Sequence, residues 1–188
     1  MNTPEARAAE HDKYTRCYNL PDYRMGANRM QDAVRILEAL PSRGSYLDVA
    51  TGRGEMLSAA MSLGFDPVMG TEVVESLLDH LRVSRAEAHD LPFADGSFHT
   101  VTMFDVIEHL IPGDDELACR ELARVARDHI IVAANNLQSK NKAGDVLHIN
   151  IRPFEEWDSL FREWFAPHKV IWVANENSLS QIWRIDLI

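Results

Sequence analysis

The sequence predicts an α/β fold in which a doubly wound, mostly parallel sheet carries helices on both faces. Three observations lead to this prediction. Strand-like and helix-like segments alternate along most of the chain, a glycine-rich turn joins one strand to the next helix, and the end of the chain is rich in β-forming residues. Strands that alternate with helices pair in parallel, because each helix returns the chain to the same end of the sheet. A length of 188 residues corresponds to one domain.

The spacing of apolar residues defines the elements in the first half of the chain. Apolar residues three or four positions apart indicate helices, and short apolar runs indicate buried strands. Pro41 ends the first helix, and Gly64 is the expected C-terminal cap of the second. In chain order, the expected elements are a helix at 33–40, a strand at 46–49, a helix at 54–63, a strand at 67–72, a short helix up to Leu81 and a weak strand near Val83.

The second half continues the alternation and closes on a hairpin. Asp114 or Asp115 is the expected cap of a helix with one apolar face, and Pro153 opens an aromatic amphipathic helix. The stretch NENS separates the two final β-rich runs, as in a hairpin turn. The expected elements are strands at 99–106 and 129–134, a helix after 115, a helix after 153 and an antiparallel hairpin formed by VIWVA and QIWRIDLI.

Composition restricts the class of protein. The formal net charge is −10, which disfavours a large nucleic-acid surface, because phosphate binding requires clustered Lys and Arg. Cys17 and Cys119 form neither a disulfide framework nor a metal-finger spacing. No apolar run approaches the ~20 residues that span a bilayer, and the polar N-terminus does not resemble a signal peptide. We therefore expect a cytoplasmic protein without membrane contact.

The stretch YLDVATGRGEML places small residues between a strand and a helix. Gly52 and Gly54 have no side chain, and the side chain of Ala50 is a single methyl group. All three residues therefore allow a ligand to approach the backbone closely. Glu72 ends the next strand, where a carboxylate can accept two hydrogen bonds from a ribose diol. Leu57 occupies the position of the third glycine of a dinucleotide-binding loop, which argues against the phosphate-cradling interpretation.

Several motifs in the same order resemble those of class I S-adenosylmethionine-dependent methyltransferases, including ubiquinone-pathway O-methyltransferases. LDVATGRGE resembles the first motif with Ala50 in place of a glycine, AHDLPFADGSFHTV resembles the adenine-binding segment, and MFDVIEHL resembles the fourth-strand motif. His99 stands where the family usually has Asp, and the usual Pro-Gly-Gly turn after the fourth strand is missing. The resemblance covers residues 30–188 and implies a Rossmann-like, seven-stranded sheet with a C-terminal antiparallel hairpin.

The resemblance also implies a set of site residues and S-adenosyl-L-methionine as the cofactor. Glu72 would bind the ribose, Asp90 would meet the adenine amino group, and Leu91 would pack on the ring. The full set of cofactor-binding residues expected from the matched motifs is Asp48, Ala50, Gly52, Gly54, Glu72, Val73, Asp90, Leu91, Phe104 and Asp105.

Candidates for the chemistry at the methyl acceptor follow the fourth strand. His109 and His148 are the expected catalytic residues, as bases for an acceptor that loses a proton. Asp105, Glu108, His109 and His148 could instead hold a divalent cation, a pattern that resembles the metal site of small-RNA 3′-end methyltransferases, with Asp105 in place of the usual Glu. In a third interpretation, His109 packs beside the cofactor, Glu108 makes a local hydrogen bond and His148 lines the acceptor pocket.

The N-terminal residues 1–28 are expected to form a lid over a single methyltransferase domain that comprises residues 1–188. Tyr14, Tyr18 and Tyr23 lie in this segment, and Arg24 or Arg29 could pair with the carboxylate of the cofactor. Packing of these arginines on the surface is the alternative.

Three functions are compatible with these motifs. The first is methyl transfer to a small-molecule acceptor, since no inserted substrate domain interrupts the core. The others are methylation of RNA 3′ ends and a non-catalytic, cofactor-binding regulatory subunit. The sequence names neither the acceptor atom nor the oligomeric state.

Overall fold

The computed structural model describes residues 2–20, 23–79, 81–141, 143–173 and 180–188. Its helices are α1 (Pro4–Tyr18), α2 (Ala27–Glu38), α3 (Glu55–Ser62), α4 (Asp114–Val125) and α5 (Phe154–Trp164), and the short 3-10 turns are η1 (Glu75–Leu77) and η2 (Ile107–His109). Its strands are β1 (Tyr46–Val49), β2 (Val68–Glu72), β3 (Val83–Arg85), β4 (Phe98–Met103), β5 (Ala126–Asn135), β6 (Lys169–Val173) and β7 (Ser180–Asp186).

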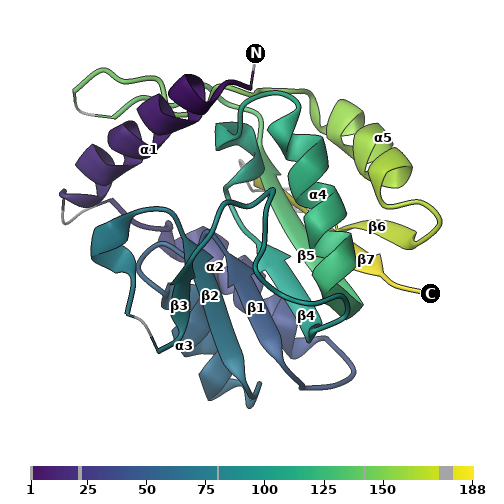
Figure 1. The fold of residues 1–188 in the computed structure, drawn as a ribbon. Coiled ribbons are helices and arrows are strands. Elements are labelled where there is room, and N and C mark those ends of the chain that lie inside the picture. Colours follow the sequence, from purple (N-terminus) through teal and green to yellow (C-terminus); the bar gives the residue numbers. More distant parts are fainter. Residues whose placement is uncertain (1, 21–22, 80, 142, 174–179) are drawn as a thin grey trace.

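These strands form one seven-stranded sheet in the order β3-β2-β1-β4-β5-β7-β6 (Figure 1). The strands from β3 to β5 are parallel, whereas β7 runs antiparallel to both β5 and β6. This arrangement confirms the predicted fold class, including the antiparallel hairpin at the end of the chain. The strand order reverses between β1 and β4, and doubly wound sheets bind their ligands at such a reversal.

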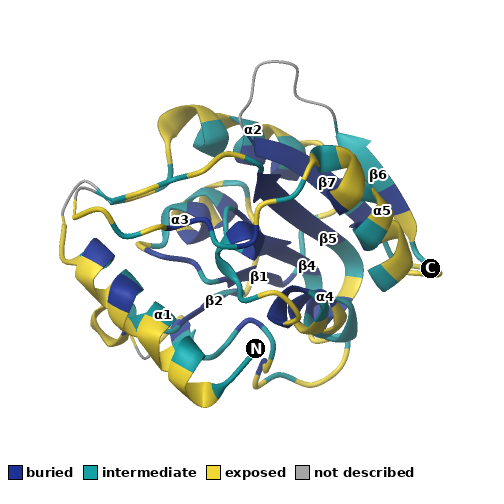
Figure 2. Cartoon of the chain, turned by 90° about the horizontal axis from the view of Figure 1, so that it is seen from above, coloured by how far each residue is buried: buried dark blue, intermediate teal, exposed yellow. Residues whose placement is uncertain are grey.

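Each face of the sheet has its own hydrophobic core. In β5, Ile130 and Val132 point to one face and Ile131 and Ala133 to the other, as strand alternation requires. The first core packs against α4 and α5 and contains Trp157, and the second packs against α2 and α3. Figure 2 shows that buried residues fill the central strands, whereas the outer helix faces are exposed. Both cores hold the carboxyl ends of the strands in fixed positions.

Most elements follow the predicted pattern, and one of the differences lies after β2. Residues 75–77 form only the short turn η1, not a helix that reaches Leu81. The side chain of Asp79 accepts hydrogen bonds from the backbone N–H groups of Leu81, Arg82 and Val83, and these bonds compete with helical ones. The predicted turn NENS lies outside the described residues. No helix in the described part of the chain is long and apolar enough to cross a membrane.

The start of α4 also differs from the prediction. Its N-cap is Gly113, which has a positive φ of 101° and makes no side-chain capping bond. Asp115 instead accepts hydrogen bonds from the backbone N–H groups of Gly113 and Glu116, and Asp114 pairs with Arg7 of α1. Because its carboxylate holds α1, Asp114 links the N-terminal segment to the core.

Two strands at the reversal end in strained backbone. Ala50 follows β1 with φ 56°, and Asp105 follows β4 with φ 54°, although neither is a glycine. Such conformations are uncommon for residues with a Cβ atom and gather at functional sites. Helix α1 lies across this edge of the sheet (Figure 1). The fold therefore brings α1 and the strained strand ends to one place.

Candidate functional site

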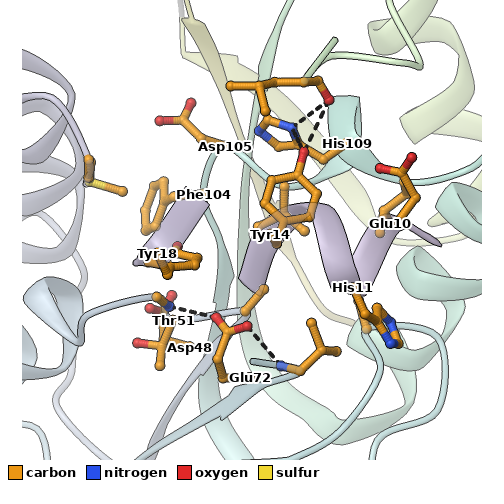
Figure 3. A pocket seen from close by; sticks show the side chains of 18 of the residues that line it. Glu10, His11, Tyr14, Tyr18, Asp48, Thr51, Glu72, Phe104, Asp105 and His109 are labelled. Atoms are coloured by element: carbon orange, nitrogen blue, oxygen red, sulfur yellow. Dashed lines mark hydrogen bonds between the residues drawn. The ribbon is translucent and has the colours of Figure 1, made fainter. Parts of the chain in front are cut away.

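A cavity of about 360 Å³ lies at the carboxyl ends of the parallel strands, beneath α1. Its walls come from α1, the loop after β1, the ends of β2 and β3, the segment after β4 and the loop that carries His148. Figure 3 shows the side chains of Tyr14 and Tyr18 from α1 together with Asp48 and Glu72 from the sheet. The cavity therefore has one part at the glycine-rich loop and another at the cluster of histidines.

Glu72 holds the glycine-rich loop in place. This buried carboxylate accepts hydrogen bonds from the backbone N–H groups of Gly52 (3.0 Å), Val73 (2.8 Å) and Val74 (3.1 Å). Burial raises the pKa of Glu72, and these N–H groups act in the opposite direction. A carboxylate has about four acceptor positions, so one remains for a ribose hydroxyl while all three backbone bonds persist.

Asp48 lies beneath the loop at the end of β1. The hydroxyl of Thr102 donates to its carboxylate over 2.6 Å, and Asp48 is almost completely buried. Burial raises the pKa of Asp48 to about 7, a shift that the hydrogen bond from Thr102 limits. Asp48 lines the cavity together with Ala50, Gly52, Glu72 and Val73.

Gly52 is constrained from two sides. Its φ is +57°, and a Cβ atom at this position would lie 2.5 Å from the hydroxyl oxygen of Tyr18. Gly54 has a similar φ of +79° and forms the N-cap of α3, but it does not line the cavity. Of the two glycines expected at the cofactor, the structure therefore brings only Gly52 to the cavity.

The segment after β3 does not bring the expected adenine-site residues to the cavity. Asp90 is exposed and lies outside the cavity lining, because a turn between Glu87 and Asp90 directs it away. Leu91 is buried in the core on the α4 side of the sheet. Glu87 lines the cavity instead, and the imidazole of His11 pairs with its carboxylate over 2.9 Å. The sequence motifs did not single out Glu87, although an acid two residues after the end of a parallel strand is a signal for such a position.

Phe104 and Asp105 reach the cavity from the end of β4, as expected. The carboxylate of Asp105 is already engaged, since it accepts hydrogen bonds from Arg29 over 2.7 Å and from Ser180 over 2.9 Å. Among the described residues, Asp105 also does not belong to the group of side chains whose atoms lie close enough together to share a cation. This corrects the four-residue set considered from the sequence.

That group consists of Glu108, His109 and His148, whose potential ligand atoms all lie within 4.8 Å of one another. Glu108 is fully buried, and neither of its carboxylate oxygens has a hydrogen-bond partner within the part of the chain that the structure describes. The rings of His109 and His148 meet edge to face at 4.7 Å between centroids. An uncompensated buried carboxylate is costly, so its environment favours either a proton or a cation.

The ionisation of this cluster follows from its enclosure. Burial, and then the charge of Asp105, raise the pKa of Glu108 well above its ordinary value. Burial, and then the neighbouring His148, lower the pKa of His109 to about 4, and burial lowers the pKa of His148 as well. At neutral pH both imidazoles are therefore uncharged and able to accept a proton or bind a metal.

Helix α1 covers the cavity through polar contacts. Arg7 donates to Asp114 over 2.6 Å and 2.9 Å, and Lys13 donates to the backbone oxygen of Val146 over 2.9 Å. Arg53, in the glycine-rich loop, donates to backbone oxygens of Tyr18 and Leu20. Arg24 lines the cavity and has no described partner, whereas Arg29 is paired with Asp105.

The fold and this site define a class of protein, and comparison with known proteins agrees. Residues 47–133 match the family model of a methyltransferase domain. That stretch of the chain thus matches a methyltransferase domain, and the chain has the fold of solved S-adenosylmethionine-dependent methyltransferases. A comparison with curated protein sequences gives no match.

Solved structures of low sequence identity share the fold. One is the 1,6-didemethyltoxoflavin-N1-methyltransferase of Burkholderia thailandensis with bound 1,6-didemethyltoxoflavin and S-adenosylhomocysteine, with a TM-score of 0.74, 16% identity, and coverage of 98% of this chain and 89% of that one. Another is a possible histamine N-methyltransferase of Thermotoga maritima, with a TM-score of 0.63, 20% identity and 97% coverage of both chains. A third is a putative methyltransferase of Haloferax volcanii in complex with the activator Trm112, with a TM-score of 0.65, 14% identity, and coverage of 95% and 96%.

Proposed function

We propose that the chain transfers the methyl group of S-adenosylmethionine to a small-molecule acceptor. The observation that carries this proposal is a single cavity lined both by the glycine-rich loop with Glu72 and by His109 with His148. A methyl donor in the first part would face an acceptor in the second. Holding the two reactants in line is the main contribution of a protein to such a displacement.

In this proposal the cofactor lies between the loop after β1 and the ends of β2 and β3. Glu72 accepts a hydrogen bond from the ribose, and Glu87 is placed to accept one from the adenine amino group. Arg24 is the better partner for the carboxylate of the cofactor, because Arg29 already pairs with Asp105. The methyl group would then point towards His109.

His109 and His148 are the proposed catalytic residues. Both are uncharged at neutral pH because burial lowers the pKa of each imidazole. When the acceptor attacks the methyl carbon, the carbon–sulfur bond breaks and S-adenosylhomocysteine leaves, and an imidazole takes the proton that the acceptor releases. An apolar and aromatic wall formed by Tyr14, Tyr23 and Leu110 would exclude water from this step.

A divalent cation is the alternative role for the same side chains, with Glu108, His109 and His148 as its ligands. The orphaned oxygens of Glu108 favour it, since one carboxylate and two imidazoles are a common donor set for zinc and other transition metals. Such an ion would supply Lewis-acid help to the acceptor oxygen or nitrogen. Binding would displace the proton from Glu108.

A similar structure and the net charge of the chain both favour a small acceptor. Among the similar structures is a methyltransferase with bound 1,6-didemethyltoxoflavin, and this chain matches 89% of its length. A net charge of −10 disfavours RNA as the acceptor. A non-catalytic role would leave the histidine cluster without a purpose.

Release of S-adenosylhomocysteine in a screen of small-molecule acceptor classes tests the proposal. Turnover with one class is expected, and His109→Asn or His148→Asn should reduce it at least tenfold, since loss of a general base costs about 10²–10⁴ in rate. His168→Gln is the matched control, because His168 lies outside the cavity. Binding of the cofactor without turnover on any small molecule would contradict the proposal.

Treatment with a chelator distinguishes a metal-binding role of Glu108, His109 and His148 from a general-base role of the histidines. If a metal is required, a chelator should abolish turnover and one divalent ion should restore it. If His109 or His148 acts as a base, turnover should survive chelation.

A further inference from the structure

Tyr14 of α1 makes a hydrogen-bonded triangle with His109 and the backbone of the His148 loop. The hydroxyl oxygen of Tyr14 lies 2.6 Å from Nδ1 of His109 and 3.1 Å from the backbone oxygen of Leu147. The same Nδ1 lies 3.0 Å from that backbone oxygen. Figure 3 shows both contacts of the His109 ring nitrogen, and its other ring nitrogen points away from them.

The donors and acceptors in this triangle determine where the proton of His109 lies. A backbone carbonyl oxygen only accepts hydrogen bonds. The hydroxyl of Tyr14 and Nδ1 of His109, which both lie close to the carbonyl oxygen of Leu147, must therefore each donate a hydrogen to it. If Nδ1 carried no proton, its lone pair would face the lone pairs of Leu147 at 3.0 Å. If Nδ1 carries the proton, it donates to Leu147 and to Tyr14, and the hydroxyl of Tyr14 donates to Leu147. Only this arrangement pairs every contact.

The rest of α1 holds Tyr14 against this triangle. Lys13 donates to the backbone oxygen of Val146, directly before Leu147, and Arg7 anchors the helix to Asp114. Burial also raises the pKa of Tyr14, so its hydroxyl keeps the proton that it donates. The N-terminal helix therefore donates hydrogen bonds to the backbone of Val146 and Leu147, the same short stretch that positions His109.

We propose that Tyr14 is a positioning residue for His109: together with the Leu147 carbonyl, it keeps the imidazole proton on Nδ1 and orients the ring so that Nε2 has a free lone pair. The catalytic role of that lone pair rests on the proposed function, whereas the tautomer follows from the hydrogen bonds alone. It makes docking of α1 a condition for an active histidine, since Tyr14 comes from α1.

The tautomer is measured by ¹⁵N NMR of the protein labelled at histidine, with no acceptor present. The signal of His109, assigned with His109→Asn, should show a protonated Nδ1 and an unprotonated Nε2. A protonated Nε2 in the folded, neutral protein would overturn the proposal. Because this readout needs no turnover, a failed acceptor screen would leave it intact.

A double-mutant cycle measures the positioning role. Tyr14→Phe should reduce kcat about tenfold, as loss of one hydrogen bond in the reacting geometry implies, with little change in KM for the cofactor. In the His109→Asn background the same change should have almost no effect, because Tyr14 acts through His109.

Tyr23→Phe is the matched control for the cycle. Tyr23 lines the same cavity, but its hydroxyl makes no hydrogen bond with His109. Its effect should be the same whether or not His109 is present. Equal effects of Tyr14→Phe in both backgrounds would overturn the positioning role, and a folded Tyr14→Phe protein, checked by circular dichroism, keeps that outcome interpretable.

Discussion

Asp48 is a buried acid whose protonation couples the site to stability. Its pKa in the folded protein is raised to about 7, above the value of 3.8 for a free side chain. A group with a raised folded pKa favours the folded state most at low pH, and this contribution is lost as the pH rises from about 4 to about 7. The free energy of unfolding is thus lower at neutral pH than at acidic pH, because Asp48 is buried at the end of β1.

Asp48→Asn should remove this dependence. We expect the variant to gain free energy of unfolding relative to the native protein as the pH rises from 4 to 8, by up to a few kcal/mol, since one pKa unit corresponds to about 1.4 kcal/mol. Urea unfolding of both proteins across this pH range measures the difference. A constant difference at all pH values would show that Asp48 titrates normally.

A comparison of Gly52 with Gly64 distinguishes the effect of backbone strain from the effect of a steric clash. Both have a positive φ, but a Cβ atom on Gly52 would meet the hydroxyl of Tyr18, whereas one on Gly64 would meet nothing within 4 Å. Replacement by alanine should cost about 1 kcal/mol of stability at either position through strain alone.

Only Gly52→Ala should also displace Tyr18 and weaken binding of S-adenosylmethionine. Calorimetric titration of the two variants checks this expectation, with Gly64→Ala as the control. Native affinity in a folded Gly52→Ala protein would mean that the cofactor does not approach this loop.

At the scale of elements, α1 differs from the helices of the core. Its buried residues are only Lys13 and Cys17, and Arg7 and Lys13 tie it to the rest of the chain through an ion pair and a hydrogen bond. Helices held without an apolar face open more easily than core helices. The N-terminal segment is thus suited to act as a cover that opens for ligand exchange.

Arg7→Ala should loosen α1 without unfolding the core. The change removes two hydrogen bonds to Asp114, and we expect amide hydrogens of α1 to exchange several-fold faster, as for a loss of about 1 kcal/mol. Hydrogen exchange read by mass spectrometry separates α1 from the sheet. Arg120→Ala is the control, because Arg120 pairs with Glu116 on the exposed face of α4 and with no other described residue. Equal exchange of α1 in all three proteins would contradict this role of Arg7.

The strongly periodic elements were predictable because packing decides them. Residues 46–49 are a strand as expected, since buried strands require continuous apolar runs. Helix α1 carries no such periodic signal, so the sequence indicated a lid but not its helical form. The turn that exposes Asp90 and brings Glu87 to the cavity depends on a local backbone bridge, which spacing alone does not reveal.

The composition of the histidine cluster was only partly predictable. Spacing placed Glu108 and His109 together after β4, and the loop with His148 does return to them. The partner of Asp105 could not be foreseen, because Arg29 and Ser180 come from distant parts of the chain. Long-range side-chain partners depend on the packed whole, not on local sequence.

For the whole molecule, the central claim is that one cavity holds S-adenosylmethionine with its ribose on Glu72. Calorimetric titration of the cofactor into the native protein, Glu72→Gln, Glu72→Ala and Glu75→Ala tests it most directly. Glu75 is the control, since it is exposed and pairs with Arg85 at the surface.

The native protein and Glu75→Ala should bind alike. Glu72→Ala should lose about 1–3 kcal/mol, the cost of removing a charged acceptor, and Glu72→Gln should also weaken binding, because its amide nitrogen cannot accept the hydrogen bond from the backbone N–H that it would face. No binding by the native protein, or equal binding by a folded Glu72→Ala protein, would contradict the claim.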